Sequence, residues 1–372
     1  MKIRKLYISG LLSLGLALIL PLSLGSCSRD SVGYNDPSEV IVNFSLDLPP
    51  ATRALDSSGE NTVKTIDILV FKNNQLQYTA IGTDITNWDT SNPSKDFKVR
   101  LIEDSSIELM VLVNARSVVA SSSGISINAT KSSIETNLLH TCVGIYDVND
   151  PDYGHLPMWG SVSGVTITSS TSTLPNIPVI RMHAKVDVDA SAVTANFELR
   201  SVRVYNYETK GRFVPDVSST HWDAATNKAL LPSVPLSSDR WGNPSFSGTG
   251  GVILHYTAIN TSINSCVGEI YLHESNNFNS SGVLLSSNDR TCLVIGGLYD
   301  DDTNESYYRV DFIDSGSSQF VNLLRNHTYS IAINTVSNPG HTDPDDAFKS
   351  DPVGLEVTII DWSNEDLNHE LQ

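Results

Sequence analysis

The chain has 372 residues, of which 18% are charged, and its formal net charge is −18. Clustered Lys and Arg hold a phosphate backbone, and no such cluster occurs beyond the first few residues, so the composition excludes nucleic acid as a partner. Low charge together with abundant Ser, Thr, Asn, Val and Ile favours strands over helices, and the length accommodates two β-sandwich domains.

The first 26 residues have the order of a secretory signal peptide. Three basic residues among the first five precede an apolar run from Leu11 to Leu22, which is too short to span a membrane in the mature protein. Small residues then lead into a cysteine in Leu24-Gly25-Ser26-Cys27, which looks like a bacterial lipobox. We therefore predict a lipoprotein with diacylglycerol and palmitate on Cys27; an ordinary signal peptide with an incidental cysteine is the alternative.

A clearly alternating strand is predicted between Glu39 and Leu48. Pro49-Pro50 ends it, and the polar linker from Ala51 to Asn61 contains Arg53 as its only basic residue. The linker leads into a second predicted strand, so Arg53 is expected to be accessible between two strands. The apolar face of the first strand consists of Val40, Val42, Phe44, Leu46 and Leu48.

Further short strands follow at the spacing of a sandwich, with turn residues between them. They are predicted at residues 63–71, 96–102, 107–114, 162–169, 178–190, 196–206, 252–256, 269–274, 290–299, 307–313, 327–336 and 354–361. Helical pattern is limited to residues 132–139 and 319–324, and residues 211–251 and 337–352 are predicted to be irregular.

The cysteines and histidines give no metal or catalytic motif. The cysteines left after lipidation allow at most one disulfide and have no zinc-site spacing, and the strand histidines have no ligand-spaced partner. No nucleophile elbow, His-Glu-x-x-His or phosphate loop is present, although the carboxylates of a glycosidase leave no local motif. We therefore predict no catalytic residue, no metal and no cofactor. The residues concerned are Cys142, Cys266, Cys292, His183, His255 and His273.

The order of several motifs across the chain resembles the fimbrillin family of Bacteroidota, the lipoprotein precursors of type V pilus subunits. Each motif alone is mostly strand alternation, and their order and spacing carry the resemblance. The motifs are Thr52-Arg53-Ala54, residues 64–71, Leu156-Pro157-Met158-Trp159-Gly160, residues 180–188, 270–274, 291–294 and 307–310, Leu324-Arg325-Asn326-His327, and the closing residues 355–362.

The resemblance implies a mechanism of assembly on the cell surface. Family members reach the outer membrane as lipoproteins, and an arginine-specific protease then cuts a linker that matches Arg53-Ala54 and removes the first strand. A strand from another subunit, in a homo- or hetero-polymer, fills the vacated groove. The expected donor is the C-terminal segment with Leu355, Val357 and Ile359; ordinary membership of the C-terminal sandwich is the alternative that the same alternation allows. The polar tail after Trp362 departs from the shaft pattern. The resulting surface fimbria would serve adhesion and biofilm formation through host or bacterial receptors.

Four parts are expected: a signal peptide at residues 1–26, a propeptide at 27–53, an N-terminal sandwich at 54–179 and a C-terminal sandwich at 180–372. Each sandwich is expected to have a Greek-key or transthyretin-like fold. The alternative is a monomeric surface lipoprotein that binds glycan or host protein and keeps its first strand and its anchor. A hydrolase is a third class, and it would need a cleft with paired carboxylates.

Overall fold

A computed structural model describes residues 38–49, 60–86, 94–142, 144–145, 155–193, 196–242, 253–257, 259, 264–300, 302–352 and the backbone of 356–361. Strands dominate these residues, with only short helices, so the predicted all-β fold is confirmed. None of the helices within the described ranges is long and apolar enough to cross a membrane. Cys27, Arg53, Ala54 and Leu355 lie outside the described residues.

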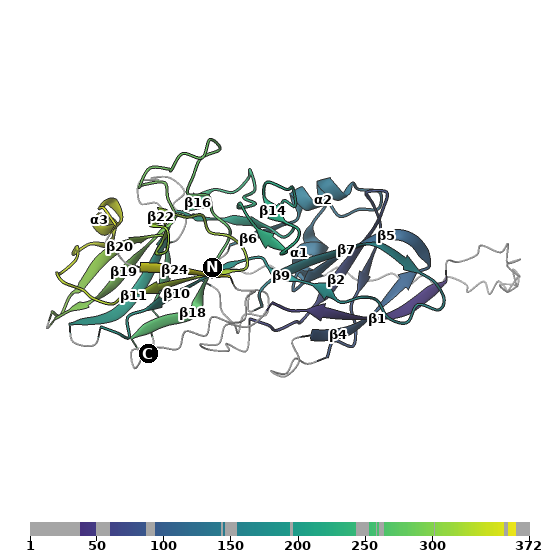
Figure 1. Ribbon diagram of the computed structural model, residues 1–372, viewed down its shortest axis with the longest axis horizontal. Helices are drawn as coiled ribbons and strands as arrows, with labels where there is room; N and C mark the ends of the chain where they lie inside the picture. The colour runs from purple at the N-terminus through teal and green to yellow at the C-terminus, as the bar shows by residue number, and fades with distance from the viewer. Residues whose placement is uncertain are drawn as a thin grey trace, which may run out of the picture. The chain divides into compact units, whose positions relative to one another are not determined.

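The elements of the first half are β1 (Glu39–Asp47), β2 (Ile66–Lys72), β3 (Gln75–Ile81), β4 (Ser94–Ile102), β5 (Asp104–Val113), α1 (Arg116–Ser121), α2 (Lys131–Asn137), β6 (Leu139–Thr141), β7 (Met158–Ile167), β8 (Ile177–Pro178) and β9 (Ile180–Arg181). Two sheets, ordered β4-β1-β8 and β3-β2-β5-β7-β9, enclose one apolar core (Figure 1). This is a sandwich in which alternate residues of each strand point inward.

Strands β2 and β5 are buried on both faces, which explains why their sequences read as apolar runs rather than as alternation. Ile68 and Val70 face the sandwich core, whereas Leu69 and Phe71 face a second apolar cluster. That second cluster also contains Phe213, Val214, Trp222 and Ala229 from the segment 211–251, and Ile134 from α2. The segment predicted to be an irregular insertion therefore covers the outer face of the five-stranded sheet.

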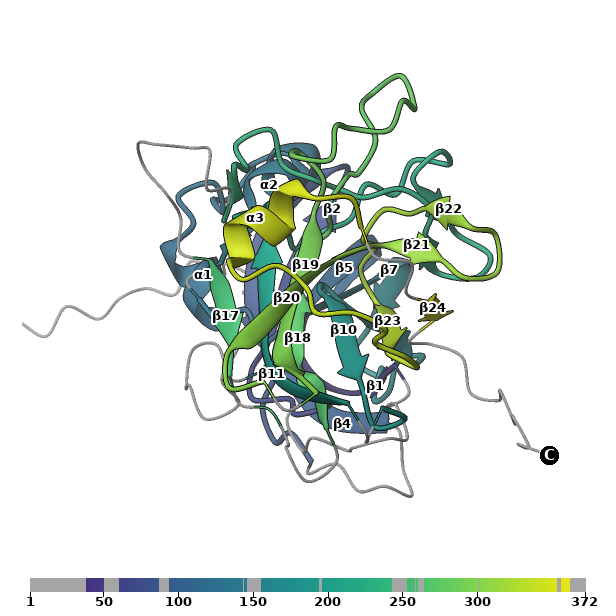
Figure 2. The same ribbon diagram turned by 90° about the vertical axis from the view of Figure 1, so that its left-hand side faces the viewer.

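The elements of the second half are β10 (Ala184–Asp189), β11 (Phe197–Tyr205), β12 (Tyr207–Glu208), β13 (Lys210–Arg212), β14 (Trp222–Asp223), β15 (Lys228–Ala229), β16 (Arg240–Trp241), β17 (Leu254–Tyr256), β18 (Ser265–Leu272), β19 (Cys292–Tyr299), β20 (Glu305–Asp311), β21 (Ile313–Asp314), β22 (Gln319–Phe320), β23 (His327–Ala332), α3 (Pro344–Lys349) and β24 (Glu356–Asp361). Sheets ordered β18-β10-β23-β24-β21-β22 and β17-β11-β19-β20 enclose a second core. Helix α3 lies against β19 and β20 (Figure 2). Phe348 of this helix stacks on Tyr205 at 4.7 Å between ring centroids.

Several local predictions are wrong in instructive ways. Residues 319–324 form the short strand β22 and a bridge through Leu323 rather than a helix, since their backbone pairs with β21 and Ser275. Strand β3 escaped prediction, and α3 lies inside a segment that was expected to be irregular. Residue 179 is outside the strands and residues 182–183 bend, so the long strand predicted at 178–190 divides into β8, β9 and β10.

Candidate functional site

The strand that alternation predicts near the N-terminus is present as β1, and it is a middle strand. It pairs antiparallel with β4 along its whole length, from Glu39 opposite Ile102 to Asp47 opposite Ser94 (Figure 1). On its other side it runs parallel to β8, where Leu46 lies opposite Ile177. Backbone hydrogen bonds therefore hold β1 on both sides.

The two faces of β1 have opposite environments. The side chains of Val42, Phe44 and Leu46 are at most 1% exposed, and the Phe44 ring stacks on Phe97 at 5.2 Å between centroids. Ile41, on the other face, is 51% exposed. The inward side chains fill the space between the two sheets, so β1 supplies part of the core of this sandwich. Leu48 is buried and Val40 half-buried at the edge of the same core.

Polar contacts add to the hold on the second side of β1. The backbone N–H of Asn43 donates to the carbonyl of Ser172 at 2.9 Å, and the Asn43 carbonyl accepts from the N–H of Leu174 at 3.2 Å. The Asp47 carbonyl accepts from the N–H of Val179 at 3.0 Å, and its carboxylate accepts from Asn176 Nδ2 at 2.8 Å. These contacts are all non-covalent. If the chain between β1 and β2 were cut, β1 could therefore dissociate and another strand could take its place.

One buried arginine holds both ends of the linker that follows β1. Arg181 Nη2 donates to the Pro49 carbonyl at 3.2 Å, before the linker, and to Asn61 Oδ1 at 2.5 Å, after it. Burial lowers the pKa of Arg181 to about 10, and the carboxylate of Glu60 opposes that shift. Glu60 itself pairs with Lys185 at 2.8 Å and accepts from Tyr271 Oη at 2.7 Å. The linker is therefore fixed on both sides of the predicted cut, which lies outside the described residues.

The predicted donor segment occupies a place in its own sheet. Val357 and Ile359 lie in β24, which runs antiparallel to β23, with Ile359 opposite Tyr329 (Figure 2). On its other side β24 meets β21, where Val357 lies opposite Asp314. In this monomer β24 is thus a middle strand of the C-terminal sheet.

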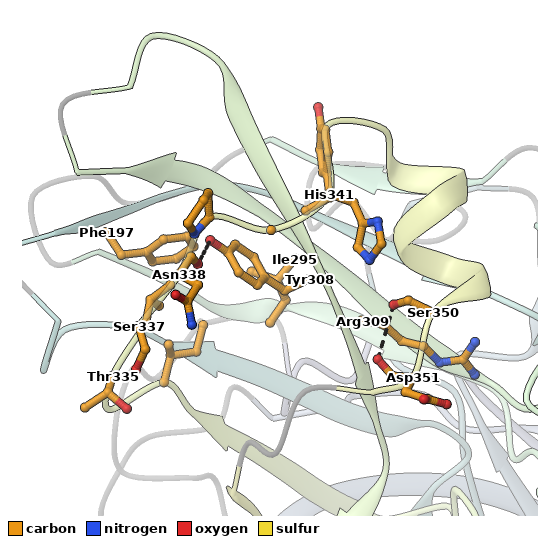
Figure 3. A pocket seen from close by; sticks show the side chains of 15 residues that line it. Phe197, Ile295, Tyr308, Arg309, Thr335, Ser337, Asn338, His341, Ser350 and Asp351 are labelled. Atoms are coloured by element: carbon orange, nitrogen blue, oxygen red, sulfur yellow. Dashed lines mark hydrogen bonds between the residues drawn. The ribbon is translucent and has the colours of Figure 1, made fainter.

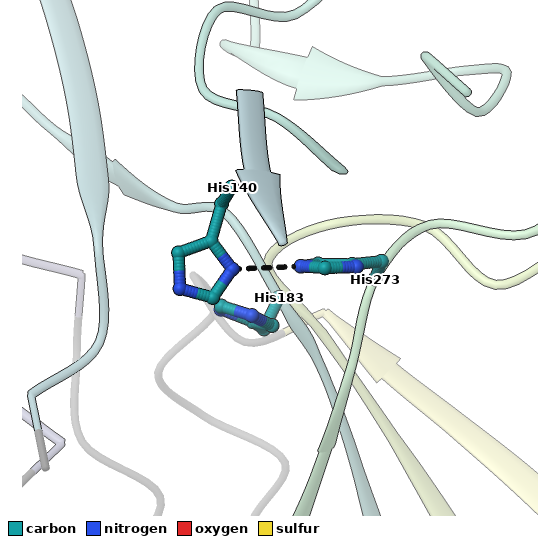
Figure 4. A group of neighbouring side chains, drawn as sticks. All are labelled: His140, His183 and His273. Carbon is teal, nitrogen blue, oxygen red and sulfur yellow. Dashed lines mark hydrogen bonds between the residues drawn. The ribbon is translucent and has the colours of Figure 1, made fainter. Parts of the chain in front are cut away.

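Three histidines from distant segments meet in a place that sequence reasoning missed (Figure 4). His140 lies in β6, His183 in the bend before β10, and His273 directly after β18. His140 Nδ1 and His273 Nε2 are 2.9 Å apart, across a separation of 133 residues. No local motif signals such a contact. His255, the third strand histidine of the sequence, is exposed on β17 and does not join the cluster.

Burial dominates the electrostatics of this histidine cluster. Loss of water around the rings lowers the pKa of His140 to about 4 and that of His273 to about 3, and it also lowers the pKa of His183. The nearby Arg325 guanidinium favours the same direction for His183 and His273. Arg325 is itself paired with Glu274 through contacts of 2.9 and 2.7 Å. The three imidazoles are therefore neutral at physiological pH.

A cavity of about 670 Å³ opens in the C-terminal half beside β20 and the segment 335–341 (Figure 3). Its lining combines aromatic rings with polar groups, namely Phe197, Tyr307, Tyr308, Asn338, His341 and Asp351. The Tyr308 hydroxyl donates to the Asn338 carbonyl at 2.9 Å, and its ring meets Phe197 edge to face at 5.7 Å between centroids. Cys142, Cys266 and Cys292 are free thiols and do not contribute a disulfide.

No protein-family model and no curated protein sequence matches the chain. Solved structures do resemble it. The tip fimbrial protein Mfa3 from Porphyromonas gingivalis is 13% identical with a TM-score of 0.48, and the match covers 87% of this chain and 100% of that one. A putative cell adhesion protein from Parabacteroides distasonis is 14% identical with a TM-score of 0.48, covering 86% and 95%. A fimbrilin from Porphyromonas gingivalis is 17% identical with a TM-score of 0.47, covering 86% and 96%.

Proposed function

We propose that the chain is a non-enzymatic structural subunit of a surface fimbria, assembled by exchange of β1 for a strand of another subunit. In this proposal it is exported as a lipoprotein anchored to the outer membrane through Cys27, and an arginine-specific protease cuts Arg53-Ala54. The observation that carries the proposal is the position of β1. It is a middle strand whose apolar side chains from Val42 to Leu46 are buried, and the segment that joins it to β2 carries its only arginine at Arg53.

Removal of β1 would leave a site that demands a replacement. Burying an apolar side chain of this kind contributes roughly 1.5–3 kcal/mol, so Val42, Phe44, Leu46 and Leu48 together contribute on the order of 6–12 kcal/mol. The facing backbone groups of β4 and of residues 172–179 would also lose their partners. An exposed apolar groove with unpaired strand edges is the arrangement that accepts an incoming strand.

In the uncut chain, the linker keeps β1 close to its own groove, where it competes with strands of other molecules. A short flexible connection holds a segment at an effective concentration on the order of millimolar, and a second molecule must outcompete it. The precursor therefore stays monomeric. After cleavage the released strand can diffuse away, and a donor that is tethered to the next subunit then wins the groove.

The proposed donor is the C-terminal segment with Leu355, Val357 and Ile359. Its alternation matches that of β1, so apolar residues at every second position can enter the same core. Donation requires β24 to detach from β23 and β21, which hold it in the monomer. Partners of the polymer are further copies of this subunit or other fimbrial subunits, and the surface would serve adhesion and biofilm formation.

The proposal is tested by cutting the purified precursor with an arginine-specific protease. We expect a new N-terminus at Ala54, followed by ladders of oligomers on gel filtration and on gels. Arg53→Gln should remain uncut and monomeric, whereas Arg200→Gln, a change at an exposed arginine of β11 that does not contact β1, should behave like the wild type. A chain that is cut after Arg53, loses β1 and still remains monomeric would refute assembly by strand exchange.

The second candidate function is a monomeric surface lipoprotein that binds glycan or host protein. The cavity beside Tyr307 and Tyr308 favours it, because aromatic faces and amide groups together suit a sugar ring. In that case Arg53→Gln would bind its receptor as the wild type does, and protease treatment would leave a stable monomer. Retention of binding without ladders would select this second function.

A further inference from the structure

We infer that His140, His183 and His273 form a binding site for one zinc ion or a closely similar first-row divalent cation. The candidate ligand atoms of the three rings all lie within 4.8 Å of one another. Neutral imidazole is a common ligand of Zn²⁺, and three histidines with an open fourth position are an established coordination set for that ion. This inference is independent of the assembly proposal.

The observed spacing is close to that of a loaded site. Zinc–nitrogen distances of about 2.0–2.1 Å in tetrahedral geometry place two nitrogens about 3.3 Å apart. His140 Nδ1 and His273 Nε2, at 2.9 Å, need to separate by only a few tenths of an ångström to admit the ion between them, and His140 must carry its proton on Nε2 rather than Nδ1 when the ion is bound. The rings of His183 and His273 are stacked at 5.0 Å with an interplanar angle of 22°, so the His183 ring must turn for its lone pair to face the ion.

The surrounding groups orient the His273 ring through a hydrogen bond, but they leave Nδ1 of His183 without a hydrogen-bond partner in the described part of the chain. His273 Nδ1 lies 3.1 Å from the carbonyl of Glu208, which can only accept, so Nδ1 carries the proton and Nε2 presents its lone pair to His140. His183 Nδ1 is buried and has no hydrogen-bond partner among the described residues. A buried nitrogen without a partner is costly, and coordination to an ion, after rotation of the ring, would remove that cost.

Space and charge also fit a single ion. A cavity of about 40 Å³ adjoins the three rings, large enough for an ion with one further ligand, and Cys142 and His155 line it as well. Gly211 lies so close to the cluster that a Cβ at this position would be 2.7 Å from His273 Cδ2. The guanidinium of Arg325, whose charge reaches His183 and His273, is paired with the carboxylate of Glu274.

The site would tie together segments that are far apart in the chain. His140 lies in β6, where its backbone is opposite Gly211 of β13. His183 and His273 instead flank the paired strands β10 and β18. An ion held by all three would cross-link the region before residue 179 to the sandwich that follows it. Binding of the ion should therefore stabilise the folded chain.

The test uses the purified chain, freed of metal with a chelator and of any affinity tag, and then given Zn²⁺. After gel filtration we expect one Zn²⁺ per chain by elemental analysis, in both the wild type and His255→Gln, an exposed histidine outside the cluster. His140→Gln should bind at least about 100-fold more weakly in competition with a chromophoric chelator. Wild type without retained zinc, or His140→Gln with unchanged affinity, would overturn the inference.

A second measurement needs no variant and so does not depend on whether His140→Gln folds. Co²⁺ added to the metal-free wild type should give the intense visible absorption of a tetrahedral site, and zinc X-ray absorption should show three nitrogens at about 2.0–2.1 Å. A sulfur-to-cobalt charge-transfer band would identify Cys142 as the fourth ligand, and its absence would indicate water; either agrees with the three-histidine site. A weak octahedral spectrum would contradict it.

Discussion

Replacement of Phe44 by alanine should weaken the hold on β1 more than any other single truncation in that strand. The Phe44 side chain is 1% exposed, packs between the two sheets and stacks on Phe97. Truncation of a buried phenylalanine to alanine costs about 3–5 kcal/mol through lost burial and the cavity left behind. Phe44→Ala should therefore lower the free energy of unfolding of the precursor by that amount, measured by urea denaturation.

The same loss has a kinetic consequence once the linker is cut. Each 1.4 kcal/mol changes an equilibrium by about tenfold, so β1 of Phe44→Ala should leave the cleaved protein at least about 100-fold faster, and subunits should form ladders sooner. The matched control is Ile41→Ala on the same strand, because Ile41 is half-exposed and points away from the core. Equal release of β1 from the two variants would refute the reasoning that burial of this face retains the strand.

Three further predictions concern other contacts. Lys185→Met should cost about 3–5 kcal/mol in urea unfolding, because it leaves the buried carboxylate of Glu60 without its cation, and adding Glu60→Gln should recover part of the loss. Gly211→Ala should displace the histidine cluster, and it should therefore lower the free energy of unfolding by about 1–3 kcal/mol and reduce zinc retention. The control Gly124→Ala, where an added Cβ has no neighbour closer than 3.6 Å, should stay within about 1 kcal/mol of the wild type. A chain ending at residue 352 lacks β24 and, after protease treatment, should cap the ladders formed by the wild type; ladders of normal length from this chain alone would exclude β24 as the donor.

The strength of the local signal explains which elements were predictable. Strand β1 was readable because one of its faces is core and the other is largely polar, so alternation is nearly perfect. Strand β3 was not, because it lies at the edge of its sheet and presents the mixed sequence QLQYTAI, with a single fully buried residue. Helix α3 has a cap at Asp343 and a proline in its first turn, which together are a local signature of a helix start.

Long-range features were beyond the reach of sequence reasoning. The segment 211–251 has the composition of a loop, and only the fold shows that Phe213 and Trp222 bury themselves against the outer face of β2 and β5. The histidine cluster joins residues up to 133 positions apart, and each histidine alone has the appearance of an ordinary core residue. Arg181 likewise gave no sign that it holds both ends of the linker, because its partners become neighbours only when β9 meets the chain around β1.

The mixed pairing of β1 imposes a direction on whatever takes its place. It runs antiparallel to β4 and parallel to β8, so a guest strand entering backwards would meet both neighbours with the wrong hydrogen-bond geometry. A slip by one residue would turn its apolar side chains to the outside. Copies joined in this way would all point the same way, and such a head-to-tail contact gives a filament with two unlike ends wherever its rotation does not close a ring.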